Sequence, residues 1–160
     1  MTVTNVEKNP KTTSMMITTV FDAPVERIWQ LWDDPRQLER WWGPPTYPAT
    51  FVEHNLRAGG RILYYMTGPN SEKTHGWWLV RSVDAPHHIE FENGFAKANG
   101  AKDPNFPTMD FRIALRSRET GGTSMTIETI FASLEEMETI MSMGMEEGMS
   151  AAVAQMDAIL

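Results

Sequence analysis

Cysteine is absent from the 160-residue sequence, which excludes disulfide bridges and thiolate chemistry. No apolar run approaches the roughly 18 residues of a membrane helix, and the N-terminus lacks the apolar core of a signal peptide. We therefore expect a cytoplasmic protein that makes no membrane contact. A chain of this length can bury a core large enough to fold as one domain.

Basic residues are also scarce: the sequence has 14 Lys and Arg but 21 Asp and Glu, and the formal net charge is −7. An acidic chain without a basic tract does not suit a phosphate backbone, so we expect no nucleic-acid partner. The four His lack the spacing of metal ligands, since adjacent His87 and His88 point to opposite faces of a strand. We accordingly expect neither a metal nor a cofactor.

Catalytic motifs are missing as well, because the sequence contains no nucleophile elbow, zinc-protease helix, phosphate-binding loop or dinucleotide glycine motif. Two isolated candidates are present. His75, close to Trp77, either bonds a ligand at the mouth of a pocket or is an exposed histidine at a loop edge. Glu53 and Arg57 either orient a polar ligand head or form a solvated surface pair. The residues therefore assign no catalytic role.

Tryptophan and methionine are abundant, with six and twelve residues. The tryptophans indicate either aromatic-lined space or an ordinary core. Near the C-terminus, Ser133 and Glu136 form a helix-capping box. Apolar residues, many of them methionine, then recur every three or four positions, and this spacing predicts one long helix over residues 133–160. The apolar face of this helix consists of Leu134, Met137, Met141, Met145, Met149, Ala152, Met156 and Ile159.

Two glycines, Gly144 and Gly148, interrupt this predicted helix, and each costs about 1 kcal/mol relative to Ala. Such a cost favours either a close backbone approach or a hollow beside the helix. Methionine suits irregular or adaptable surfaces. The helix face is therefore either a core face with gap-filling methionines or the wall of a ligand cavity, and the two interpretations are compatible.

The rest of the chain predicts strands and two short helices. Residues 1–12 are polar and unpatterned, and we expect a disordered tail there. Residues 13–22 read as a strand, and helices follow from Pro24 and from Asp34 as far as Gly43. Six further strands are expected, over residues 50–57, 61–67, 75–84, 87–95, 108–116 and 123–132.

This order, β-α-α-β6-α, predicts an α+β domain over residues 13–160 in which a curved antiparallel sheet wraps around the C-terminal helix. A wedge between sheet and helix becomes a pocket wherever side chains do not fill it. On the strand over residues 61–67 we expect Ile62, Tyr64 and Met66 to face the helix, although Leu63 and Tyr65 are apolar too. On the strands over residues 87–95 and 108–116, we expect the same of Ile89, Phe91 and Ile113. The candidate ligand-binding residues are Trp41, Trp42, Tyr64, Met66, His75, Trp77, Phe91, Met109, Phe111, Met141, Met145 and Met149.

Four segments together resemble one known pattern: DPRQLERWWGPP (34–45), RAGGR (57–61), MTGP (66–69) and GMEEGMSAAVAQMDAIL (144–160). Over roughly residues 13–160 the chain resembles the START-like (SRPBCC) superfamily, in the branch homologous to the C-terminal domain of the activator of the heat-shock protein 90 ATPase. The resemblance implies a helix-grip fold with a cavity between the sheet and the C-terminal helix. It also implies a link to the stress response.

The chain departs from this pattern in three places. Met149 stands where a tryptophan is common, which enlarges or softens the cavity. Asn55 replaces a usual Asp before the glycine turn, and the His87-His88 pair replaces an acidic or basic pair. The last two lie near turns and leave the predicted fold intact.

Three functions fit these features. The leading hypothesis is the binding of a hydrophobic or aromatic small molecule in the cavity. The resemblance implies a second, a co-chaperone-like interaction module whose partner is a chaperone or another protein. The third is an acid–base enzyme, such as a cyclase, dehydratase or hydrolase, which needs interacting titratable groups in the cavity. A monomer and a homodimer both remain open.

Overall fold

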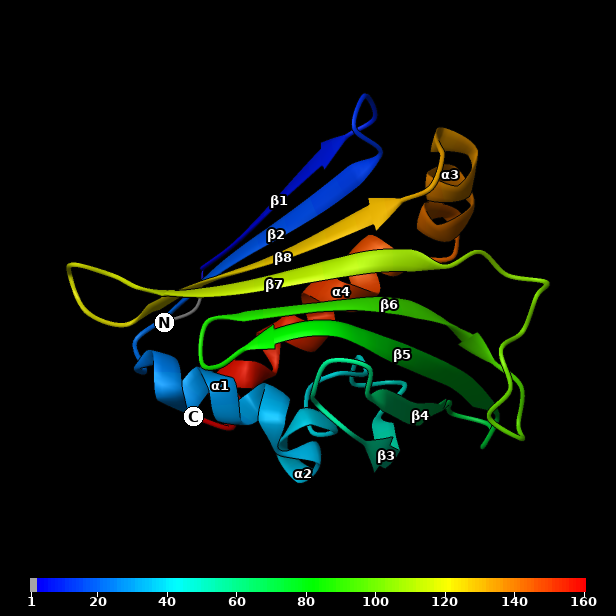
Figure 1. The fold of residues 1–160 in the computed structure, drawn as a ribbon, viewed down its shortest axis with the longest axis horizontal. Coiled ribbons are helices and arrows are strands. Elements are labelled where there is room, and N and C mark those ends of the chain that lie inside the picture. The colour runs from blue at the N-terminus through cyan, green and yellow to red at the C-terminus, as the bar shows by residue number, and fades with distance from the viewer. Residues whose placement is uncertain (1–2) are drawn as a thin grey trace.

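In residues 3–160, which the computed structural model describes, eight strands form one antiparallel sheet in the order β1-β2-β8-β7-β6-β5-β4-β3 (Figure 1). The strands are β1 Val3–Asn9, β2 Ser14–Phe21, β3 Ala49–His54, β4 Arg61–Thr67, β5 Lys73–Asp84, β6 His88–Ala96, β7 Met109–Ser117 and β8 Thr123–Phe131. The helices are α1 Val25–Asp33, α2 Pro35–Leu38, α3 Leu134–Ser142, α4 Met145–Ala154 and the short 3-10 helix η1 Met156–Ala158.

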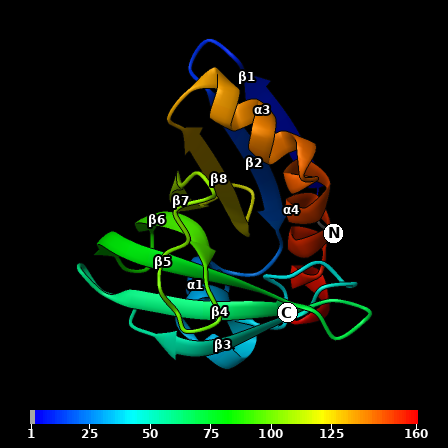
Figure 2. The ribbon, with the colours of Figure 1, turned by 90° about the vertical axis from the view of Figure 1, so that its right-hand side faces the viewer.

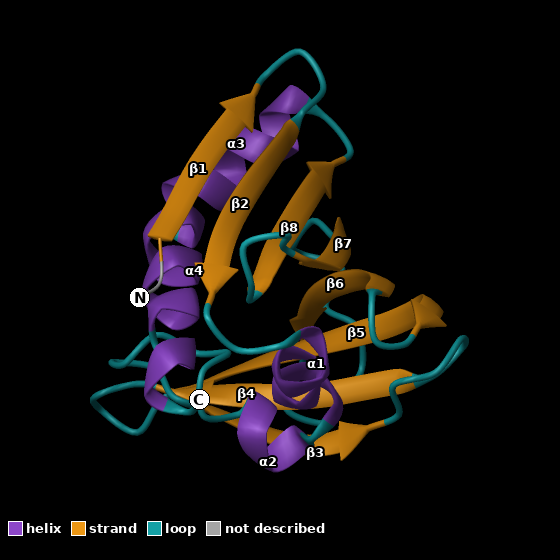
Figure 3. Cartoon of the chain, turned by 90° about the vertical axis from the view of Figure 1, so that its left-hand side faces the viewer, coloured by secondary structure: helices purple, strands orange, loops and turns teal. Residues whose placement is uncertain are grey.

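The predicted fold class is confirmed, because a curved antiparallel sheet holds helices against its inner face. Figure 2 shows α3 and α4 running along one side of the bent sheet, from the β1–β2 end toward β4 and β3. Helices α1 and α2 lie at the end of the sheet near β3 (Figure 3). No helix in residues 3–160 is long and apolar enough to cross a membrane.

The expectation of a disordered tail over residues 1–12 is wrong for residues 3–9, and the first two residues lie outside the described part of the chain. Strand β1 pairs with β2 without interruption from Val3↔Val20 to Asn9↔Ser14. An edge strand pairs on one side only and is mostly wet, so its sequence needs no clear alternation of apolar residues. Lys8 Nζ also lies 2.6 Å from a carboxylate oxygen of Glu146, which links this strand to α4.

The inner face of the sheet carries the core. Ile62, Tyr64, Ile89 and Phe91 are buried, as the chosen phase predicts, and so are Met109, Phe111 and Ile113. Across the middle of the sheet, the ring of Phe91 stacks on Trp78 at 4.1 Å and on Phe111 at 5.1 Å between centroids. Alternate side chains of a strand face one side, so this phase defines which residues can meet the helices.

The prediction of one continuous C-terminal helix is wrong, although the predicted cap is present. Ser133 Oγ accepts a hydrogen bond from the backbone N–H of Glu136 at 3.1 Å. Helix α3 ends at Ser142, and α4 starts at Met145 after Gly144 takes a left-handed conformation with φ +87°. A left-handed residue cannot continue a right-handed helix, and glycine adopts this conformation at little cost.

The two helix glycines are expected to respond in opposite ways to replacement by alanine. A Cβ atom at Gly144 or Gly148 meets nothing within 4 Å, so steric overlap affects neither variant. Gly144→Ala is expected to lower the free energy of unfolding by about 1–2 kcal/mol, because of its positive φ. Gly148→Ala, inside a regular helix, is expected to raise it by up to about 1 kcal/mol. Urea unfolding measures both, and shifts of the same sign would contradict the assigned backbone.

Candidate ligand-binding cavity

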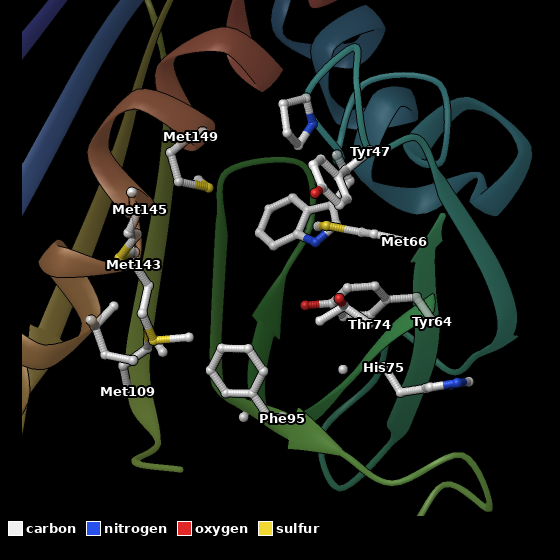
Figure 4. A pocket seen from close by; sticks show the side chains of 17 residues that line it. Tyr47, Tyr64, Met66, Thr74, His75, Phe95, Met109, Met143, Met145 and Met149 are labelled. Atoms are coloured by element: carbon white, nitrogen blue, oxygen red, sulfur yellow. The ribbon is translucent and has the colours of Figure 1, made fainter. Parts of the chain in front are cut away.

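A cavity of about 410 Å³ lies between the helices α3 and α4 and the inner face of strands β4 to β7 (Figure 4). The segment between α2 and β3 closes a further side. The wall residues are Trp42, Pro44, Tyr47, Tyr64, Met66, Thr74, His75, Gly76, Gly94, Phe95, Met109, Ile140, Met143, Gly144, Met145, Gly148 and Met149.

The structure brings most of the predicted cavity residues together. Figure 4 shows methionines from the helices and from β7 on one side of the cavity, with Tyr64 and Met66 of β4 opposite them. The predicted residues that line it are Trp42, Tyr64, Met66, His75, Met109, Met145 and Met149. Strand phase predicted Tyr64, Met66 and Met109, and helix periodicity predicted Met145 and Met149. Trp42 was expected as aromatic lining and His75 as a residue at the mouth of a pocket.

The other predicted residues lie elsewhere. Trp41 is fully buried, and its indole N–H donates to the Leu31 carbonyl oxygen at 2.9 Å. Phe91 and Phe111 stack on each other within the core. Met141 is half-buried against the core, and it precedes the break at Gly144, which changes the helix direction.

Trp77 is also absent from the cavity wall, because it is one residue out of phase with the inward-facing Trp78. Its indole N–H donates to the Phe95 carbonyl oxygen at 3.0 Å. The Lys102 ammonium lies 4.2 Å from the centre of its ring. Trp77 therefore serves the opposite face of the sheet.

Some wall residues were not predicted, and glycines are prominent among them. A Cβ atom at Gly76 would lie 2.4 Å from the Tyr64 ring, and one at Gly94 would lie 2.5 Å from the Trp77 ring. Glycine inside a strand is a sequence signal for such a close approach. The wall residues without such a signal are Pro44, Tyr47, Thr74, Phe95, Ile140 and Met143.

Gly144 and Gly148 face the cavity with open space around the positions of their missing Cβ atoms. Of the two explanations for these glycines, the hollow beside the helix is the one that fits. The absence of side chains at both positions adds to the cavity volume.

The wall is apolar and contains no Asp, Glu, Lys or Arg. Its thioethers come from Met66, Met109, Met143, Met145 and Met149. Polar side-chain atoms are supplied by the hydroxyls of Tyr47, Tyr64 and Thr74, whereas the indole nitrogen of Trp42 is itself buried. Figure 4 shows the His75 imidazole turned away from the centre of the cavity. The wall can therefore bind an apolar body and offers only uncharged hydrogen-bonding groups near its centre.

Tyr64 is the polar side chain most deeply set in this wall, with 8% of its surface exposed. Its ring stacks on Phe51 at 5.0 Å between centroids. Its hydroxyl donates to Asn93 Oδ1 at 3.3 Å. Burial raises the pKa of the Tyr64 hydroxyl above the ordinary 10.0, because the phenolate would lose its hydration. Tyr64 is therefore a neutral hydrogen-bond donor at physiological pH.

A curved antiparallel sheet around C-terminal helices, with a cavity between them, defines a START-like helix-grip domain, which is a ligand-binding fold in general. Residues 22–160 match the family described as Activator of Hsp90 ATPase homolog 1-like protein, and the chain belongs to this family. No curated protein matches the chain.

Several solved structures are similar to this chain. A crystal structure of protein Ms6760 from Mycobacterium smegmatis is 43% identical over 98% of this chain and 95% of that one, with a TM-score of 0.90. A solution structure from Arthrobacter aurescens is 46% identical over 97% and 90% of the two chains, with a TM-score of 0.92. One from Staphylococcus epidermidis is 25% identical over 97% and 92%, with a TM-score of 0.83.

The raised pKa of Tyr64 predicts how stability depends on alkaline pH. Above the ordinary value of 10.0, the unfolded chain loses a proton that folded Tyr64 keeps, so the free energy of unfolding falls as pH rises. One retained proton makes this fall at most about 1.4 kcal/mol per pH unit. Urea unfolding at about pH 9 and about pH 11 is expected to show a smaller fall in Tyr64→Phe than in the parent protein. Tyr47→Phe, at an exposed position, is the control, and an equal fall in the Tyr64 variant and the parent would contradict the assignment.

Proposed function

We propose that this protein binds an uncharged, mostly apolar small molecule in the cavity between its helices and its sheet. The observation that carries the proposal is a wall of methionine and aromatic side chains around about 410 Å³, without a charged residue. Small-molecule sites commonly enclose about 300–1,000 Å³ and combine an apolar wall with few polar groups. The cavity agrees with that description in both size and chemistry.

The chemistry of the wall favours a neutral occupant. A charged ligand would lose its hydration on entering the cavity, and no side chain of opposite charge lines the wall to compensate for that loss. The five methionines provide flexible, polarisable contacts, which suit the faces of rings as well as aliphatic chains. A hydrophobic or aromatic molecule is therefore the occupant that we propose.

The two alternative functions, a protein-interaction module and an acid–base enzyme, are supported by fewer observations. The description of the family names an activator of the Hsp90 ATPase, and this is what supports a protein-interaction module with a role in stress. An acid–base enzyme needs interacting titratable groups, and no carboxylate lines the cavity. The cytoplasmic location and the oligomeric state stay predictions.

The first experiment is native mass spectrometry of the purified protein beside its denatured mass. We expect an extra mass that disappears on denaturation and that identifies a retained small molecule. A chaperone pull-down on the same preparation tests the interaction module. Capture of a chaperone by a ligand-free protein would favour that alternative over small-molecule binding.

A substitution that fills the cavity tests the location of binding. Gly148→Leu places an isobutyl group in open space beside the wall, whereas Ala154→Leu adds the same group to an exposed position of α4. For the neutral fluorescent probe N-phenyl-1-naphthylamine, we expect Gly148→Leu to weaken binding about tenfold, through overpacking of the occupied site.

The Ala154→Leu variant is expected to bind this probe with the affinity of the parent protein. Circular dichroism and thermal unfolding establish that both variants are folded. Equal affinities of the two variants would place the probe outside the cavity and would contradict the proposal.

A further inference from the structure

Three buried tryptophans carry indole N–H groups without a hydrogen-bond partner among the described residues, namely Trp32, Trp42 and Trp78. A buried donor without a partner costs about 1–3 kcal/mol, and such groups are few in folded proteins. Trp41 and Trp77 show the usual situation, because each donates its indole N–H to a backbone carbonyl at about 3 Å. The unpaired donors are therefore a feature that requires an explanation.

Two of these indoles surround the hydroxyl of Tyr64. The ring centres of Trp42 and Trp78 are 4.7 Å apart, and each lies close to 6 Å from the Tyr64 ring, at 6.2 Å and 6.1 Å. Burial raises the pKa of Tyr64, and the indole N–H groups of Trp42 and Trp78 oppose that rise, because both lie near the phenolic oxygen. Neither reaches full hydrogen-bond geometry.

The positive N–H ends of two indoles near the phenolic oxygen favour negative charge on it, and they therefore make its own proton a stronger hydrogen-bond donor. That proton goes to Asn93 Oδ1 at 3.3 Å, which is longer than the usual 2.7–2.8 Å of an O–H···O bond. Figure 4 shows the hydroxyl of Tyr64 directed into the cavity. A strong donor with a distant partner thus faces the ligand space.

We propose that Tyr64 donates a hydrogen bond to a neutral oxygen acceptor on the bound molecule, and that Trp42 and Trp78 are positioning residues for this bond. The inference rests on the proposed function and narrows its ligand class. It selects apolar molecules that carry a ketone, ester or quinone carbonyl over pure hydrocarbons, which lack the acceptor. It selects them over carboxylates too, because no cationic side chain lines the cavity.

Three probes of one ring system test the selection, namely 9-fluorenone, fluorene and fluorene-9-carboxylate. Fluorenone and fluorene differ only in a carbonyl against a methylene group, so the ratio of their affinities isolates the acceptor. We expect fluorenone to bind about tenfold more tightly than fluorene, as one ordinary hydrogen bond predicts, and the carboxylate to bind most weakly. The infrared carbonyl stretch of bound fluorenone is expected at lower frequency than in an apolar solvent.

The variant Tyr64→Phe removes the donor and keeps the ring. It is expected to reduce fluorenone affinity about tenfold, to leave fluorene affinity unchanged and to abolish the shift of the carbonyl stretch. Tyr65→Phe is the matched control, because Tyr65 is the next residue of β4 and its ring lies outside the cavity wall, 4.5 Å from the Lys73 ammonium. That control is expected to keep the parent ratio.

Trp78→Phe tests the positioning role, since it removes one indole donor from a residue that does not line the cavity. The shift of the bound carbonyl stretch is expected to become smaller, which a loss of stability alone would not produce. If this buried substitution prevents folding, Asn93→Ala replaces it. Removing the competing acceptor is expected to tighten fluorenone binding several-fold and to leave fluorene unaffected.

The outcomes separate this inference from the proposed function. Binding of none of the three probes would contradict small-molecule binding itself. Equal binding of fluorene and fluorenone, in the parent and in Tyr64→Phe, would keep the cavity as a binding site and overturn the role of Tyr64. The same conclusion follows if the carboxylate binds best or if the carbonyl stretch of bound fluorenone does not shift.

Discussion

The stack of Trp78, Phe91 and Phe111 across β5, β6 and β7 is the contact on which the rest of this structure depends. Phe91 lies 4.1 Å from Trp78 and 5.1 Å from Phe111 between ring centres, so three adjacent strands share one rigid aromatic layer. Trp42 comes from the segment after α2 and packs 4.7 Å from Trp78. One end of the wedge between sheet and helices is thereby filled, because aromatic rings bury large areas in well-defined arrangements.

The other end of the wedge stays open for reasons that are equally local. Gly76 lets the Tyr64 ring lie against the neighbouring strand, and Gly144 and Gly148 leave open space on the helix side. The left-handed turn at Gly144 divides the helix and sets α3 and α4 in different directions. Methionines complete the wall, and their flexibility lets the same surface adapt to different occupants. Together these features produce a neutral, apolar space.

Because the cavity wall carries no charge, its few polar atoms have a large effect on which ligands it can bind. In a medium of low dielectric, a hydrogen bond is stronger than in water, and an unpaired donor is costly. The hydroxyl of Tyr64, with two indole N–H groups beside its oxygen, is the point where these effects meet. Specificity in this cavity therefore depends on hydrogen bonding by uncharged groups. Among residues 3–160 the ion pairs lie outside the cavity wall, and Lys8 with Glu146 and Arg112 with Glu90 are examples.

The sequence by itself determined the α+β class, most strand positions, the inward phase and five of the cavity residues, because these follow from periodicity and turn chemistry. It did not reveal β1, since an edge strand of polar residues is stabilised by its pairing with β2 and by the contact of Lys8 with Glu146 in α4. The sequence pattern wrongly placed Trp77 and Met141 in the cavity. Two adjacent tryptophans do not show which of them faces inward, and helical spacing does not show where the helix changes direction. Only the tertiary structure decided where the wedge is filled and where it is open, since that depends on which side chains from distant segments meet.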